Sequence, residues 1–234
     1  MIVLIILSFN DSKYYVTFGG FTLDWYKNLF EDEVIIDALK TTLFVAFVSA
    51  SIATIIGTLG AIGINQMRTR NIILSISDIP LLNADIVTGV SMMLLFTRFT
   101  TLSTYTVLLS HITFEIPYVM LNVMPRLNAF NKDLYNASLD LGASKGYTIR
   151  KIMIPFLMPG IISGFLMSLT MSIDDFSITY FTRGAGTNTI STMIYTELKR
   201  GINPELYALS TLIFLTVFIL LILMNWRSLK DARK

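Results

Sequence analysis

Long apolar runs make up most of the chain, and polar residues fall in short clusters between them. A helix that crosses a hydrocarbon core of about 30 Å needs about 20 mostly apolar residues. Five stretches meet this requirement: Thr41–Asn65, Ile72–Phe96, Tyr105–Pro125, Pro155–Tyr180 and Leu206–Trp226. The pattern therefore predicts an all-α, polytopic bundle of transmembrane helices that forms one domain over residues 1–234.

The amino-terminal run MIVLIILSF is apolar but too short to cross a membrane. It has no basic start and no small-residue cleavage site, so it does not resemble a signal peptide. We expect it to be the outer end of a partial first span, which would give six spans with the five complete ones. A short buried or interfacial segment is the alternative. The following TLDWYKNLF run predicts a short surface helix.

Basic residues are unevenly distributed among the segments between the apolar runs. Residues 66–71, residues 126–154 and the tail from Arg227 hold eleven of the 18 Lys and Arg residues. The positive-inside rule places such segments on the cytoplasmic side. The loop at 127–154 and the carboxyl terminus are therefore predicted to be cytoplasmic, with residues 10–40 and 181–205 outside.

The composition agrees with a membrane protein and excludes several other classes. Hydrophobic residues make up 53% of the chain, charged residues only 15%, and the mean hydropathy is +0.64. Soluble domains carry about a quarter charged residues, and a net charge of +2 is too small for a nucleic-acid partner. The chain has no cysteine and a single histidine, His111, so we predict no metal site.

The loop at 127–154 carries the most informative pattern. DLYNASLDL predicts a helix with Leu134, Ser138 and Leu141 on one face. Gly142 follows where a left-handed residue would end that helix, and ASKGYTIRKIMI predicts a second short helix before Pro155 and Pro159 open the next span. The result would be a compact cytoplasmic knob. An ordinary inter-span loop with an amphipathic surface helix is the alternative.

Carboxylates inside the apolar runs are costly and therefore candidates for function. Asp85, Glu115, Asp174 and Asp175 all lie in such runs, and no Lys or Arg lies deep in any of them. Neighbours on a helix are separated by about 100°, so we expect one aspartate of the adjacent pair to face a pathway and the other a helix. A solvated pair at a helix end is the alternative.

Aromatic residues near these acids suit a cationic ligand. Tyr118, Phe176 and Tyr180 could each add cation–π attraction of about 0.5–2 kcal/mol. A flexible diamine or triamine would match carboxylates spaced along a path.

Two further patterns indicate contacts between helices. His111 and Glu115 lie at i and i+4, which puts them on one helix face. Because no third ligand is evident, we expect a polar helix–helix contact, or a bend before Pro117, and not a metal site. Gly57, Gly60 and Gly63 predict close helix packing.

The run NASLDLGASKGYTIRKIMIPFLMPGI resembles the coupling-loop signature of ABC importer permeases: Glu-Ala-Ala, three residues, Gly, about nine residues, then an apolar residue and Pro. Asn136 stands where the family has Glu, and Ser138 where it usually has Ala. The resemblance implies that the loop docks on a cytoplasmic ATPase through Asn136, Ala137, Ser138, Asp140, Leu141, Gly142, Ala143, Ser144 and Pro155. The chain lacks a phosphate-binding G-x-x-x-x-G-K-[ST] loop, so we expect it to bind no cofactor and ATP with Mg²⁺ to be bound by the partner.

The runs DIVTGVSMMLLF, SHITFEIPYV and SLTMSIDDFSITYF resemble spermidine/putrescine importer permeases of the PotC type, over nearly the whole chain. This implies the type I ABC importer permease fold in the plasma (inner) membrane and import of polyamines by alternating access. The implied partners are a second homologous permease, two cytoplasmic ATPase subunits and an extracytoplasmic substrate-binding protein. The residues expected along the substrate pathway are Asp85, Glu115, Tyr118, Asp174, Asp175 and Phe176.

Two other functions stay open. The cargo could be another cationic solute or a metal complex, since related permeases serve such importers. An intramembrane enzyme could use Asp85 with Asp174, but no Gly-x-Gly-Asp run accompanies either residue, and that hypothesis leaves the coupling loop unexplained.

Overall fold

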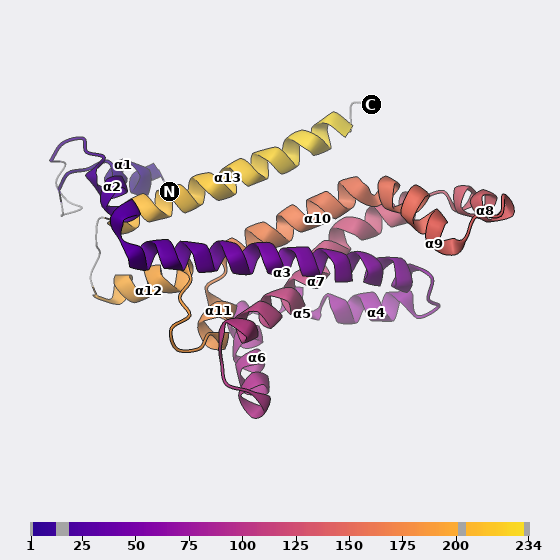
Figure 1. Cartoon of the computed structure of the whole chain (residues 1–234), viewed down its shortest axis with the longest axis horizontal. Coiled ribbons are helices and arrows are strands. Elements are labelled where there is room, and N and C mark those ends of the chain that lie inside the picture. Colours follow the sequence, from indigo (N-terminus) through magenta and orange to yellow (C-terminus); the bar gives the residue numbers. More distant parts are fainter. Residues whose placement is uncertain (1, 13–18, 201–204, 232–234) are drawn as a thin grey trace.

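The computed structural model describes residues 2–12, 19–200 and 205–231, and these are folded almost entirely as helices. Figure 1 shows them arranged along one long axis, with the amino-terminal helices at one end and α8 and α9 at the other. The helices are α1 (Ile2–Ser8), α2 (Asp24–Glu31), α3 (Glu33–Asn65), α4 (Arg70–Ser77), α5 (Ile79–Leu82), α6 (Asp85–Phe99), α7 (Thr104–Ala129), α8 (Lys132–Asp140), α9 (Lys145–Thr148), the π-helix η1 (Ile149–Met153), α10 (Ile154–Asp174), α11 (Ser177–Thr182), α12 (Ile190–Arg200) and α13 (Glu205–Asp231).

Helices α3, α7 and α10 pack against one another and form the centre of the molecule. Helix α3 begins where the Asp32 side chain accepts hydrogen bonds from the backbone N–H groups of Val34 and Ile35, at 2.8 and 3.4 Å. It then runs along most of the long axis in Figure 1. Large apolar side chains cover its outer face, so that face suits lipid or another membrane subunit: Leu43, Phe44, Phe47, Ile55, Ile56 and Leu59.

Val119 of α7 lies against a glycine of each neighbouring helix. A Cβ atom added at Gly57 of α3 would lie 2.8 Å from the Cβ of Val119, and one at Gly164 of α10 would lie 3.1 Å from its Cα. Small residues allow helix backbones to approach closely in a membrane. The packing prediction is confirmed at Gly57, whereas Gly60 and Gly63 have nothing within 4 Å of an added Cβ.

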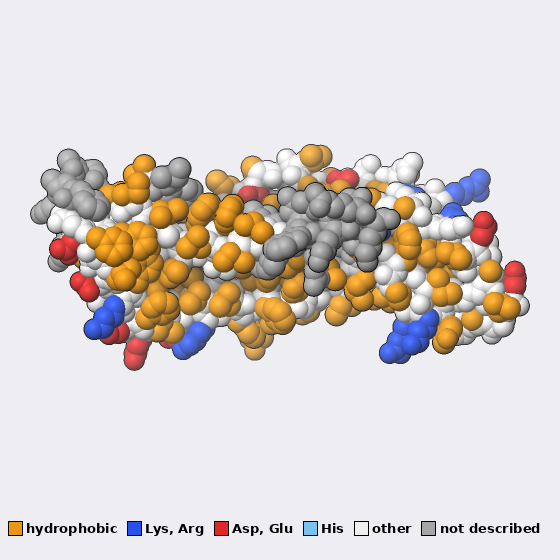
Figure 2. Space-filling view, turned by 90° about the horizontal axis from the view of Figure 1, so that it is seen from above, with side chains coloured by type: hydrophobic (Ala, Val, Ile, Leu, Met, Phe, Trp, Pro, Cys, Tyr) orange, Lys and Arg blue, Asp and Glu red, His pale blue; other side chains and the backbone are white. Residues whose placement is uncertain are grey.

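Two apolar clusters lie toward opposite ends of the bundle. One joins α3, α7 and α10 near the knob: Ala61, Ile62, Val119, Met120, Val123, Met124, Leu127, Phe130, Met153 and Leu157. The other joins α2, α3, α12 and α13: Leu29, Ile35, Ala38, Ile190, Met193, Ala208 and Leu209. In Figure 2 hydrophobic side chains extend along the length of the visible face, and Lys and Arg lie toward its ends. This distribution fits a molecule whose long axis crosses a membrane.

Two of the predicted spans are broken. The predicted helix over Ile72–Phe96 is bent by 103° between Arg70–Leu82 and Asp85–Phe99. Pro80 and the extended backbone of Asn83 lie at this bend, where proline has no N–H to continue a helix. The prediction for Pro155–Tyr180 is wrong past Asp174, because α10 ends there and α11 starts at Ser177.

Three described helices are long and apolar enough to span a membrane, and the bent pair could add a fourth. They are Glu33–Asn65, Thr104–Ala129 and Lys145–Asp174. In α13 the structure describes a shorter apolar stretch, Tyr207–Ile219. The amino-terminal run forms α1, which packs against α13, and the predicted surface helix appears as α2. Arg233 and Lys234 of the predicted cytoplasmic tail lie outside the described residues.

A Gly57→Ala substitution tests the close contact between α3 and α7. We expect it to destabilise the purified protein by about 1–3 kcal/mol, because the new methyl group overpacks the space held by Val119. Gly60→Ala is the matched control, one turn along the same helix with open space around it. Thermal unfolding measures both variants, and equal midpoints for them would contradict the packing account.

Candidate functional site

The knob at the end of the molecule is built from two short helices joined by a glycine bend. The Asn131 side chain caps α8 by accepting from the backbone N–H of Asp133 at 2.8 Å, and the Ser144 side chain caps α9. Gly142 between them has φ +86°, a left-handed value that favours glycine. The Ser138 and Thr148 hydroxyls lie 2.9 Å apart and join the two helices. The predicted helix, glycine bend and second helix are therefore confirmed.

The second helix of the knob continues directly into the membrane-spanning part. Helix α9 is followed without a break by η1 and α10, so that Lys145–Asp174 forms one 30-residue helix. Its length is about 45 Å at 1.5 Å per residue. Pro155 lies inside this helix, just after η1, where the π-helix changes to the α-helix α10. A displacement of the knob would therefore be carried along one rod to Asp174.

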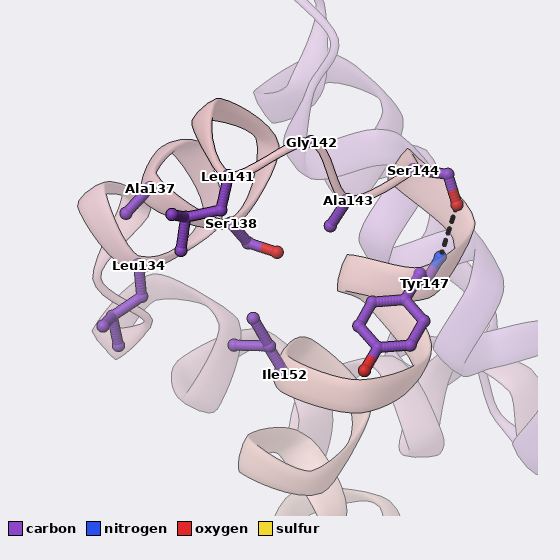
Figure 3. A pocket seen from close by; sticks show the side chains of 9 residues that line it. All are labelled: Leu134, Ala137, Ser138, Leu141, Gly142, Ala143, Ser144, Tyr147 and Ile152. Atoms are coloured by element: carbon purple, nitrogen blue, oxygen red, sulfur yellow. Dashed lines mark hydrogen bonds between the residues drawn. The ribbon is translucent and has the colours of Figure 1, made fainter.

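The knob carries a shallow, open hollow of about 670 Å³ whose walls are largely apolar. Figure 3 shows the residues that line it, from α8, the bend at 141–144, α9 and η1: Leu134, Ala137, Ser138, Leu141, Gly142, Ala143, Ser144, Tyr147 and Ile152. Leu141 is 90% exposed, and Leu134 and Tyr147 are more than half exposed. Apolar side chains gathered on an exposed tip mark a surface for a protein partner.

Six of the nine residues predicted to couple to the ATPase line this hollow, and Asn136, Asp140 and Pro155 do not. Asn136 lines a separate hollow of about 510 Å³ between α8 and the end of α3, together with Asn65 and Lys132. Asp140 is exposed at the end of α8. Pro155 is exposed at the start of α10, beyond the knob.

The adjacent aspartates differ in their surroundings because the helix ends between them. Asp174 is the last residue of α10 and is exposed. Asp175 has extended backbone, and its side chain accepts from the backbone N–H groups of Ile178 and Thr179, at 3.2 and 2.8 Å, and from the Thr179 hydroxyl at 2.8 Å. Aspartate favours such capping positions over helix interiors. The expectation that both aspartates lie on one continuous helix, about 100° apart, is therefore wrong.

His111 and Glu115 lie at the centre of a buried polar network, which confirms the predicted polar contact between helices. Glu115 is fully buried and accepts from the Ser49 hydroxyl of α3 at 2.7 Å. His111 is 1% exposed, with Nδ1 2.6 Å from the Ser172 hydroxyl oxygen and Nε2 2.8 Å from that of Thr179. Within the described residues no group of three or more metal-ligating side chains is found.

The other predicted pathway residues are more open. Asp85 begins α6 and is exposed, and Tyr118 on α7 is half-buried within electrostatic reach of that carboxylate. Phe176 follows Asp175, and its ring lies 5.2 Å from that of Tyr180 and 4.5 Å from that of Tyr195. Asp85 and Tyr118 thus lie at the bend of one broken span, and Asp174 and Phe176 at the break of another. Glu115 and Asp175 are buried in the network between helices.

Four residues of this region were not predicted as site residues: Ser49, Ser172, Thr179 and Tyr195. Thr179 could have been found from its i+4 spacing to Asp175 once a helix start was expected there. Ser49 and Tyr195 reach the site from α3 and α12, and no local pattern connects them with it.

The chain matches, over residues 2–228, the family described as the binding-protein-dependent transport system inner membrane component. The chain belongs to this family. It is 34% identical over 226 residues to the spermidine/putrescine transport system permease protein PotC of Haemophilus influenzae, covering 95% of this chain and 88% of that protein. It is 33% identical over 223 residues to the putrescine transport system permease protein PotI of Escherichia coli, covering 91% of this chain and 79% of that protein.

Solved structures of ABC transporters share this permease's fold. A bacterial transporter involved in import of the polysaccharide alginate matches with a TM-score of 0.73 at 16% identity, covering 98% of this chain and 88% of that chain. The MetNI methionine transporter in an inward-facing conformation matches with a TM-score of 0.66 at 18% identity, covering 86% of this chain and 98% of that chain. The permease is therefore a membrane transport subunit and not an enzyme, which removes the intramembrane aspartate enzyme as an alternative.

The division between the two aspartates leads to a test of stability. We expect Asp175→Ala to destabilise the purified permease by about 1–2 kcal/mol, because it removes the acceptor for the first N–H groups of α11. Asp174→Ala should change stability by less than about 0.5 kcal/mol, because that side chain lies on the surface. Thermal unfolding compares the two, and the reverse order would contradict the assigned cap.

Proposed function

We propose that this permease imports polyamines such as spermidine and putrescine. The names of its relatives in two polyamine systems support this cargo. The chemistry of the broken spans supports it as well, because Asp174 and Asp85 offer exposed carboxylates, and Phe176 stands beside Asp174 with Tyr180 and Tyr195 against its ring. Carboxylates bind ammonium groups as ion pairs, and aromatic faces add cation–π attraction. The substrate pathway then runs past Asp85, Tyr118, Asp174 and Phe176, while Glu115 and Asp175 support it from within.

The continuous helix Lys145–Asp174 is the observation that carries the proposed mechanism. One end of this helix lies in the knob, and its other end is Asp174, which precedes Asp175. When two ATPase subunits bind ATP and Mg²⁺ and close, the loop at 127–154 moves with them. The rod carries that movement to the break at Asp175, and the pathway opens alternately to the two sides of the membrane.

The assembly that fits this role places the knob and the carboxyl terminus in the cytoplasm. Helix α1 packs beside α13, and the spans together form a single permease domain in the plasma (inner) membrane. The exposed apolar face of α3 suits a second, homologous permease. An external binding protein delivers the cargo. At the ATPase, Asn136 provides a polar but uncharged contact, unlike the Glu usual in this family.

Uptake of labelled spermidine tests the cargo. The permease is expressed with its partner subunits in cells that lack their own polyamine importers, as wild type and as Asp174→Asn. We expect at least a tenfold lower rate for the variant, because an amide cannot neutralise an ammonium group. Asp37→Asn is the control, since that carboxylate is 76% exposed and pairs with Lys40 on the surface.

Undiminished uptake by an assembled Asp174→Asn complex would contradict the role of Asp174. A wild-type complex that hydrolyses ATP but takes up no spermidine would overturn the cargo, and competition by other cations and metal complexes would then identify the class carried.

A second experiment tests coupling through the knob. Gly142→Ala forces a side chain into a left-handed backbone, at a cost of about 1–2 kcal/mol, and should reorient α8 against α9. We expect at least a fivefold loss of cargo moved per ATP hydrolysed. Gly146→Ala is the matched control in α9, where an added Cβ meets nothing within 4 Å. Equal coupling in the two variants would contradict the role given to the glycine bend.

A further inference from the structure

The ring of His111 connects both sides of the break between α10 and α11. Its Nδ1 lies 2.6 Å from the Ser172 hydroxyl oxygen, in the last turn of α10. Its Nε2 lies 2.8 Å from the Thr179 hydroxyl oxygen, in α11. Since the backbone is not helical at Asp175, no continuous backbone ladder fixes the angle between the two helices there, and the imidazole joins them from the side.

The hydrogen bonds around the imidazole ring are consistent with one tautomer, in which Nε2 carries the hydrogen. The Thr179 hydroxyl donates to Asp175 at 2.8 Å, so its oxygen is left to accept the N–H of His111 Nε2. Nδ1 then accepts from the Ser172 hydroxyl. The hydrogen bonds thus form a series from Ser172 through His111 and Thr179 to Asp175, in which each hydroxyl hydrogen is used once. The series ends on the carboxylate that caps α11.

The same face of α7 also makes a buried polar contact with α3. Glu115 lies one turn after His111, is fully buried and accepts from the Ser49 hydroxyl at 2.7 Å. Its second oxygen, Oε2, has no hydrogen-bond partner among the residues that the structure describes. The face of α7 that carries His111 and Glu115 therefore contacts three of its neighbours, α3, α10 and α11, through buried polar groups.

Among the described helices, α11 packs most extensively against α6. These helices pack closely, since a Cβ atom added at Gly89 of α6 would lie 3.1 Å from the Ser177 carbonyl oxygen and 3.2 Å from the Ile178 Cα. In Figure 1, α6 and α11 lie together on one side of the bundle, away from α10 and the knob. A change of angle at Asp175 would thus swing α6 with α11.

We infer that His111 is a positioning residue: by bridging Ser172 and Thr179 it sets the angle at which the α6–α11 pair leaves the rod, and so the position of that pair relative to Asp174. Its importance for transport rests on the proposed function, whereas its effect on the angle does not. In this role His111 contacts no cargo.

Pulsed EPR distances test the angle directly. The chain has no cysteine, so Met158→Cys on α10 and Thr97→Cys on α6 place spin labels at two exposed positions without further changes to this subunit. The measurement uses the whole transporter, reconstituted in lipid and free of nucleotide, after uptake by the labelled complex has been verified. Three variants are compared in that background: His111→Gln, His111→Asn and His111→Leu.

Gln and Asn form a matched pair that differs by one methylene group. The amide of Gln reaches about as far as Nε2 and can bind Thr179, whereas that of Asn ends near the position of Nδ1. We expect Gln to keep the wild-type distance distribution, and Asn and Leu to broaden it or add a second distance. The maximal rate of uptake should fall at least fivefold for Asn and Leu and less than twofold for Gln. The half-saturating cargo concentration should stay within twofold, because the binding protein captures the cargo.

Ser110→Ala controls for loss of a buried polar group on the same helix, since that hydroxyl donates only to the Thr106 carbonyl of its own helix. It should match the wild type in both measurements. An unchanged distance distribution in Asn would overturn the inference, and if Leu does not assemble, Asn and Gln decide alone. A changed distribution in a complex that does not import polyamines would uphold the positioning role and refute the cargo.

Discussion

A polar group withdrawn from water inside an apolar bundle must have a hydrogen-bond partner, and the centre of this permease is arranged around that requirement. The apolar residues set the pattern of spans, whereas the buried polar groups of α3, α7, α10 and α11 hydrogen-bond to one another across helices. Ser49, Glu115, His111, Ser172, Thr179 and Asp175 meet there across four helices. The apolar clusters on either side supply burial, and the polar groups supply the register in which the helices meet.

The break after α10 follows from the same requirement. Ending a helix in an apolar setting exposes backbone N–H groups at the start of the next one, and these need acceptors. Asp175 supplies the acceptor for two of them, and this is why a carboxylate is stable at that position. The broken span is therefore a built feature: one aspartate stabilises the break, and its neighbour at the end of the rod stays exposed. The helix Lys145–Asp174 runs from the knob to that point, with η1 and Pro159 within it.

The sequence predicted the local features well and the breaks badly. The knob was predictable because its signals are short-range: a helix pattern, a glycine at the required left-handed position, and prolines near the start of α10. The breaks were not, because apolar composition alone cannot distinguish one long helix from two short ones at an angle. Asn83 and Asp175 are each compatible with a continuous helix and with a break between two helices. The partners of Glu115 and His111 lie 61 to 68 residues away in sequence, so no pattern within one helix could identify them.

The separation of roles between the two aspartates also bears on how cargo could be released. A carboxylate held by three fixed donors, as Asp175 is, already has its charge compensated and binds an additional cation weakly. Asp174, at the exposed end of α10, has no such set of backbone donors and can exchange water for an ammonium group and back again. Transport needs a site that binds and then releases, and an exposed carboxylate whose surroundings change with the angle at the break meets both demands. A site built from the buried pair, Glu115 and Asp175, would require the network between helices to open on every cycle.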